Sequence, residues 1–331
     1  MRPRSALGLL FALPLALATG CATTKQAAGP SEPPIAQAGE ARDPATVALE
    51  PFEFEEDGFA YVDGRTGESL SFDEVAARAR EAEVVLTGEQ HDQASHHHLQ
   101  ARVVGALGEA QGGLAVGLEM VNWQQQEALD RFSEGEIDVD GLFSALDWER
   151  TWGHDADLYR EVLAVGQEAG ARFVALNAPR ALVRAVAKKG LDGLTDEEKA
   201  QLPELDLTDE VHRSSIEAVF KHHHPPTGAG EAFERFYAAQ VLWDESMADR
   251  SVKALESGAQ RLVVLAGVGH VAGYRGIPQR IARRRPGTRL LTIVPITLSE
   301  KERPEDVARV AIAEGEADIL AIKKPREVIS L

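Results

Sequence analysis

The stretch from Val84 to Asp92 constrains the fold more than any other part of the sequence. Val84–Leu86 are apolar and mostly β-branched, which is typical of a short buried strand, and a glycine closes the run. Two acids, an amide and an imidazole follow in Glu89–Asp92, before a helical pattern begins at Ser95. In an open α/β sheet, ligands bind beyond the carboxyl ends of strands. The stretch therefore indicates either a functional loop or a polar turn in which Asp92 or Ser95 caps a helix.

Apolar runs alternate with helical patterns along the rest of the chain. Two short strands around an Asp-Gly turn are predicted first, followed by the run at Val84 and by further strands at Leu114–Leu118, Arg172–Leu176, Arg261–Ala266, Leu290–Val294 and Asp318–Ile322. This alternation predicts an α/β fold, with a mainly parallel sheet flanked by helices. Residues from about 190 to 257 carry no strand signal and are predicted to form an α-helical insertion in a domain that spans residues 51–331.

Four of these strand-like runs end in polar or ionisable side chains. The first delivers Glu89 and His91, the second Glu119, the third Asn177 and Arg180, and the fourth His270. The carboxyl ends of parallel strands lie on one edge of the sheet, so these residues are expected to converge. Each has a structural explanation when taken alone, as a solvated acid or a packed histidine. Four in succession favour a functional edge.

Two opposite chemistries suit this set of side chains. The candidate metal ligands and catalytic groups are Glu89, His91, Glu119 and His270, which together could bind a divalent metal and activate water. Without a metal, a histidine oriented by a glutamate would act as general base, while Asn177 and Arg180 stabilise an oxyanion. The chain has no HExxH pair, and Gly267–Ala272 departs from GxGxxG, so a metalloprotease helix and a nucleotide site are not predicted.

Three further histidine-containing or acidic stretches were weighed for function. His96–His98 falls in a first helical turn, where neighbours point about 100° apart, and is predicted to be an exposed patch. His222–His224 precedes two prolines and is predicted to end a helix, where cations suit the macrodipole. Both triplets could also bind a metal loosely. Trp243–Met247 is predicted to be helix core, with Asp244 as its one site candidate.

The N-terminus is typical of a bacterial lipoprotein signal peptide, predicted over residues 1–20. Arg2 and Arg4 precede an apolar run that is too short to span a bilayer comfortably. The run ends in Ala18-Thr19-Gly20-Cys21, which resembles the lipobox, so lipidation of Cys21 is predicted. Residues 21–50 are then a flexible tether. Ala22 is not the aspartate of the inner-membrane retention signal, which favours an outer-membrane lipoprotein, periplasmic or surface-exposed.

Net charge excludes one class of partner. The chain carries 35 basic and 53 acidic residues, a formal charge of −18, and removal of Arg2 and Arg4 leaves 33 − 53 = −20. A nucleic-acid backbone requires basic patches, so no nucleic-acid partner is expected. Membrane contact is instead expected through the lipid anchor.

The ordered motifs resemble those of the ChaN-like haem-binding lipoprotein family, within the superfamily that includes Tiki, TraB and erythromycin-esterase-like proteins. Besides the lipidation cysteine, the resemblance rests on Leu86–Asp92, Gly117–Met120 with Gln125-Gln126, Ala175–Pro179, Leu242–Ala248 and Leu265–Val271. Thr87 departs from the small or apolar residue more usual in the family. The resemblance covers most of the chain from about Phe59 to Val294.

The resemblance implies a protein that binds haem for iron uptake, as a homodimer around the cofactor. It also implies descent from metal-dependent hydrolases, whose site positions map onto Glu89, His91, Glu119 and His270. Haem ligation in the family resembles a tyrosinate or histidine mode, and Tyr159 is the first choice of ligand, although a helix-surface tyrosine is the alternative interpretation. The full set of expected cofactor-binding residues is Tyr159, His154, Asn177, Arg180 and Asp244.

Three hypotheses follow for function. The favoured one is a haem-binding lipoprotein with a relict hydrolase site. The alternative is an active metal-dependent hydrolase of peptide or ester bonds. The third, a purely structural surface protein, does not explain the strand-end acids and histidines.

Overall fold

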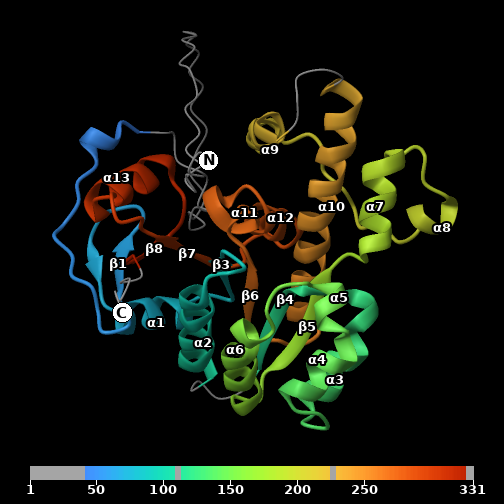
Figure 1. Ribbon diagram of the computed structural model, residues 1–331, viewed down its shortest axis with the longest axis horizontal. Helices are drawn as coiled ribbons and strands as arrows, with labels where there is room; N and C mark the ends of the chain where they lie inside the picture. The colour runs from blue at the N-terminus through green and yellow to red at the C-terminus, as the bar shows by residue number, and fades with distance from the viewer. Residues whose placement is uncertain (1–41, 109–112, 224–228, 326–331) are drawn as a thin grey trace, which may run out of the picture.

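The computed structural model describes residues 42–108, 113–223 and 229–325, which form a single sheet with helices on both faces (Figure 1). The strand order is β2-β1-β8-β7-β3-β6-β4-β5, and all pairs from β8 to β5 are parallel, while β1 runs antiparallel to both of its neighbours. The strands are β1 (Phe59–Asp63), β2 (Ser69–Leu70), β3 (Val84–Glu89), β4 (Leu114–Asn122), β5 (Arg172–Asn177), β6 (Arg261–Gly267), β7 (Leu290–Thr297) and β8 (Ile319–Lys323). The predicted mainly parallel α/β fold is confirmed.

Helices cover the two faces of the sheet in separate layers. One layer contains α1 (Phe72–Glu81), α2 (Ala94–Gly108), α3 (Gln126–Ser133), α4 (Val139–Leu146), α5 (Trp148–Thr151) and α6 (Asp157–Glu168). The opposite layer contains the second half of α10 (Ala229–Glu256), α12 (Ile277–Arg284) and α13 (Pro304–Glu314). Side chains alternate between the two cores along β3, because Val85 packs in the first and Val84 and Leu86 pack in the second. Burial on both faces explains why the strands are continuous apolar runs.

The helical insertion packs on the first half of α10, beyond the edge of the sheet (Figure 1). It comprises α7 (Arg180–Lys189), α8 (Asp196–Lys199) and α9 (Glu210–His223), with a stretch free of helix and strand from residue 202 to residue 209. Phe220 of α9 packs with Phe233 and Tyr237 of α10 in a small separate core. Met247, further along α10, packs in the main core instead. The insertion therefore merges with the main domain before the predicted boundary at residue 257.

The predicted flexible tether is too long at its C-terminal end. Arg42 donates its backbone N–H to the carbonyl of Ala313 at 3.0 Å, and Val47 is 5% exposed in the core beside α13. Residues 42–50 are thus packed on the domain, because their few apolar side chains cover α13. Cys21 and the signal peptide lie outside the described residues, so lipidation and outer-membrane location stay predictions. Within the described ranges, no helix combines the length and the apolar character needed to cross a membrane.

Candidate functional site

Three adjacent strands bring the predicted acids and histidines together. In the sheet, β6 lies between β3 and β4, and its last residue, Gly267, donates its N–H to Glu119 Oε2 at 2.5 Å. A Cβ atom on Gly267 would lie 3.0 Å from His91 Cε1 and 3.5 Å from Glu119 Oε2, so both side chains press against this glycine. On α11 (Val268–Val271), the Nε2 atom of His270 lies 3.6 Å from Glu119 Oε1. The predicted convergence of Glu119 with the two histidines is confirmed.

The buried carboxylate of Glu89 orients the imidazole of His91. The Glu89 side chain is buried, and its Oε1 lies 2.7 Å from His91 Nδ1, while Gln100 Nε2 donates to its Oε2 at 2.8 Å. Burial alone would raise the pKa of Glu89, but the hydrogen bond with His91 and the neighbouring polar groups hold this pKa below its usual value. Burial would lower the pKa of His91. The hydrogen bond with Glu89 and the negative charge of Glu119 outweigh this effect, so the pKa of His91 is raised. The Nε2 atom of His91 is left facing Gly267.

Asp244 orients His270 in the same way. Its Oδ1 lies 2.6 Å from His270 Nδ1, and the Asp244 residue is only 2% exposed. Burial would lower the pKa of His270, but the negative charges of Glu119 and Asp244 raise it to about 9. Two histidine–carboxylate pairs therefore lie at this edge, with His270 Nε2 toward Glu119 and His91 Nε2 toward the adjacent Gly267. Such an arrangement can donate and accept protons on a bound molecule.

Asn177 and Arg180, the other predicted members of this sheet edge, contact backbone carbonyl groups rather than the two histidines. Asn177 donates to the carbonyl of Glu119 at 2.8 Å, and its Oδ1 accepts from the N–H of Ala178. Arg180 is exposed at the start of α7 and donates to the carbonyl of Trp152 at 3.2 Å. Backbone partners thus occupy one N–H and the carbonyl oxygen of the Asn177 amide, and its role toward an oxyanion stays a prediction. Glu119 itself lies within β4 rather than after it, since the strand continues to Asn122.

The geometry does not support the predicted metal site. Among the residues that the structure describes, no group of three or more His, Cys, Asp or Glu side chains could hold a metal ion. Both oxygens of Glu89 already accept hydrogen bonds, and Glu119 Oε2 accepts the N–H of Gly267. These carboxylate oxygens are therefore engaged within the protein.

The prediction of an exposed patch at His96–His98 is wrong for its first two members. His96 and His97 are 0% and 1% exposed, because the first turn of α2 packs between the end of β3 and α6. His97 Nε2 lies 3.3 Å from the carbonyl of His91, so this ring supports the site from behind. Only His98 reaches the surface, where it pairs with Glu161 at 2.9 Å. The second triplet does end a helix, as α9 stops at His223, and His224 lies outside the described residues.

Tyr159 is buried, contrary to both interpretations made from the sequence. It is 1% exposed, its hydroxyl donates to Glu89 Oε1 at 2.8 Å, and it accepts from Trp152 Nε1 at 3.0 Å. Burial, together with the charge of Glu89, raises the pKa of Tyr159, which keeps it a neutral phenol. A haem iron would need an accessible tyrosinate. The structure therefore does not offer Tyr159 as that ligand.

A cavity of about 570 Å³ opens next to this cluster, and its lining includes Phe143, Trp148 and His154. The imidazole of His154 lies 4.9 Å from that of His91 and 5.3 Å from the Trp152 ring, measured between ring centroids. Burial and the neighbouring His91 lower the pKa of His154, which favours its neutral form near pH 7. A cavity of this size is within the usual range for small-molecule sites. His154 thus presents a neutral imidazole to a cavity whose lining also includes two aromatic side chains and three acids.

Several supporting residues were missed by the sequence analysis. Gln100 follows His97 by three positions on α2, so their shared helix face was a signal that could have identified it. His212 in the insertion and Arg280 on α12 gave no signal that pointed to Asp244, since no local spacing relates either residue to it. Their contact with Asp244 depends on packing between distant segments.

A family model described as "Haem-binding uptake, Tiki superfamily, ChaN" matches residues 75–281. The solved structure described as "Cofacial heme binding to ChaN of Campylobacter jejuni" is 21% identical with a TM-score of 0.64, and the alignment covers 83% of this chain and all of that one (100%). That likeness shows the fold.

Two further solved structures match with lower scores. An erythromycin esterase mutant in its open conformation is 15% identical with a TM-score of 0.44, over 72% of this chain and 77% of that chain. A protein from Bacillus cereus is 12% identical with a TM-score of 0.47, over 81% and 95% of the two chains. These scores support no functional argument. No curated protein matches the chain.

Proposed function

The chain belongs to the ChaN family of haem-binding uptake proteins in the Tiki superfamily, and from this premise we propose that it binds haem in the uptake of haem or iron. The observation that carries the proposal within the chain is the cavity in which His154 lies beside the aromatic side chains Phe143 and Trp148. A neutral imidazole is an established axial ligand of haem iron, and aromatic side chains suit the apolar macrocycle. These residues fit the cofactor that the family implies.

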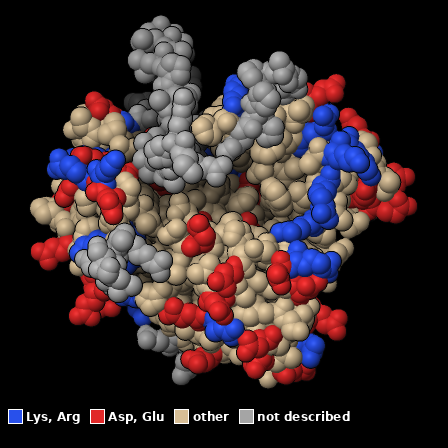
Figure 2. Space-filling model, in the orientation of Figure 1, with Lys and Arg blue, Asp and Glu red and all other residues tan. Residues whose placement is uncertain are grey.

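The charge around the cavity indicates how haem would be oriented. Asp147, Glu149 and Asp155 line it, and Figure 2 shows acidic side chains spread over the lower half of this face, where Figure 1 places α3, α4 and α6. Carboxylates repel haem propionates, so the propionates should point out of the cavity. Arg180, next to Trp152, is a cation that could receive one of them. We therefore keep Arg180 among the proposed cofactor-binding residues.

The proposal has a direct test in a haemin titration of the protein without its signal peptide. We expect the Soret band to shift and to saturate at a simple haem-to-protein ratio. Size-exclusion chromatography on the same samples reports whether haem joins two chains, as the predicted homodimer requires. No Soret shift at micromolar haemin would refute haem binding. With the lipid predicted on Cys21, this uptake step would take place at the outer membrane.

A second candidate function is metal-free hydrolysis of an ester or peptide bond, and the observation that favours it is the pair of histidine–carboxylate dyads around Glu119. The carboxylate of Glu119 would accept a proton from water as the water oxygen attacks the carbonyl carbon. Protonated His270, whose pKa is raised to about 9, would give its Nε2 proton to the leaving group. The bond broken is then the one between carbonyl carbon and leaving atom.

We expect a His270→Ala variant to lose hydrolysis of an activated ester by about 100-fold or more, while haemin binding stays as in the wild type. The measurement is the initial rate of ester cleavage at pH 7, corrected for the reaction in buffer. Equal rates for the wild type and the variant would remove His270 from any catalytic role and, with it, this candidate function.

A further inference from the structure

Asp244 is a buried carboxylate that contacts histidines from two distant parts of the chain. Its Oδ1 binds His270 Nδ1, and its Oδ2 lies 3.2 Å from Nε2 of His212. Asp244 and His212 are each 2% exposed. His212 belongs to α9 of the helical insertion, whereas His270 follows β6. A buried side chain of the insertion therefore touches the carboxylate that orients a histidine of the strand-end site.

The neighbours of His212 determine which ring nitrogen carries its proton. Nη2 of Arg280 lies 3.2 Å from His212 Nδ1, and a guanidinium can only donate. Nδ1 must therefore accept, which leaves the proton on Nε2, the atom that faces Asp244. Tyr237, whose hydroxyl lies 3.4 Å from the same Nδ1, can donate instead to the carbonyl of Asp209 at 3.2 Å. Arg280, His212 and Asp244 thus form a chain of hydrogen bonds in which each donor is defined.

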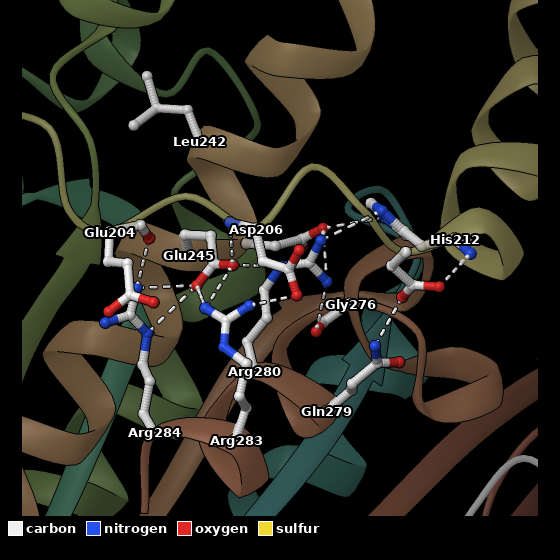
Figure 3. Close-up of polar contacts among 12 residues, drawn as sticks. Glu204, Asp206, His212, Leu242, Glu245, Gly276, Gln279, Arg280, Arg283 and Arg284 are labelled. Atoms are coloured by element: carbon white, nitrogen blue, oxygen red, sulfur yellow. Dashed lines mark hydrogen bonds and ion pairs between the residues drawn. The ribbon is translucent and has the colours of Figure 1, made fainter.

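Arg280 is itself held in place on several sides (Figure 3). It is 2% exposed, and its Nη1 donates to the carbonyls of Arg275 and Gly276 at 2.7 and 3.0 Å. Its Nε lies 3.4 Å from Glu245 Oε1, an ion-pair contact with the residue next to Asp244. Figure 3 shows His212 and Glu245 reaching Arg280 from opposite sides. The arginine therefore presents Nη2 to His212 in one fixed direction.

We propose that His212 and Arg280 are positioning residues, which act through Asp244 to hold His270 with its Nε2 atom toward Glu119. The helical insertion is then a part of the strand-end site, because it supplies the donor that fixes the far oxygen of Asp244. Without His212, the nearest cation to that oxygen is Arg280 at 3.8 Å, too far for a hydrogen bond. The carboxylate can then rotate, and His270 loses its fixed orientation. The catalytic meaning of this arrangement rests on the second candidate function, but the arrangement itself does not.

The test compares two amide substitutions at position 212 that differ only in reach. Glutamine places its amide nitrogen near the position of His212 Nε2 and can still donate to Asp244, whereas asparagine is too short. We would measure the ring N–H proton of His270 by NMR in protein labelled with ¹⁵N-histidine, assigned by its loss in His270→Ala. His98→Gln serves as the control, since His98 is a surface histidine that pairs with Glu161.

We expect wild type, His98→Gln and His212→Gln to show a slowly exchanging Nδ1 proton on His270. In His212→Asn this proton should exchange with water about tenfold faster. Identical exchange in His212→Asn and His212→Gln would overturn the proposal. Arg280→Lys gives a second comparison if His212→Asn fails to fold, because lysine keeps the charge but reaches His212 with a single donor. Unchanged exchange of the His270 Nδ1 proton in Arg280→Lys would also contradict the proposal. Ester hydrolysis measured on the same samples is a separate readout. If the wild-type protein does not hydrolyse the ester, the second candidate function is rejected, but the result on the positioning of His270 still stands.

Discussion

Replacing Glu245 with leucine is expected to destabilise the fold by about 3–5 kcal/mol, the usual cost of removing one partner from a buried ionic network. Glu245 is 0% exposed and accepts from Arg283 at 2.8 Å on both oxygens and from Arg284 at 2.8 Å. It also accepts the N–H of Asp206 at 3.1 Å, which ties the insertion to α10 and α12. Leucine removes these contacts and leaves the buried Arg280 with Asp244, 3.8 Å away, as its one remaining carboxylate contact among the described residues.

The measurement is urea unfolding at equilibrium, with the free energy obtained from midpoint and slope. Glu231→Leu is the matched control, because Glu231 lies on the same helix and makes an exposed ion pair with Arg235 at 3.5 Å. Such pairs contribute about 0–1 kcal/mol, so the control should unfold nearly as the wild type does. A loss of less than about 1 kcal/mol in Glu245→Leu would show that the arginines are stabilised by water rather than by this carboxylate.

Glu245 also shows where prediction from the sequence stops. Asp244 and Glu245 are adjacent acids on one predicted helix. The sequence indicated Asp244 as the site candidate there, but it identified neither His270 as the partner of Asp244 nor the three arginines as partners of Glu245. The three partners, Arg280, Arg283 and Arg284, do lie at helical spacing on α12, so one stripe of charge was visible. Which acid it would meet depends on how α12 crosses α10, and that is set by packing around the whole sheet.

The strand-end residues were predictable because their signal is local in the sequence. Runs such as Val84–Leu86 are recognisable from a few residues, and a parallel sheet places all their carboxyl ends on one edge. The common edge of His91, Glu119 and His270 therefore needed no knowledge of strand order, whereas their contact did, because it depends on β6 lying between β3 and β4. The burial of a polar side chain, in contrast, depends on segments that are distant in the sequence. His97 and Tyr159 were misjudged because their exposure depends on α2 and α6 packing together over the end of β3.

Replacing His154 with alanine is expected to weaken haemin binding by at least about tenfold, or about 1.4 kcal/mol, and to change the spectrum of the bound haem. The physical reason is the loss of the one predicted cofactor-binding side chain that combines a neutral imidazole with a place in the cavity lining. Haemin titrations followed in the Soret and visible bands give the affinity and the spin state together. A change of ligand alters the spectrum even where the affinity changes little.

Two further variants distinguish ligation from general damage. His98→Ala removes a histidine that pairs with Glu161 on the surface, so it should bind haemin as the wild type does. Tyr159→Phe removes the hydroxyl that donates to Glu89 and should leave the haem spectrum unchanged, because that hydroxyl is buried and neutral. A spectrum altered by Tyr159→Phe and unaffected by His154→Ala would restore the tyrosinate mode. It would also require α6 to move on binding, since the Tyr159 hydroxyl could reach a haem iron only after leaving Glu89 and Trp152.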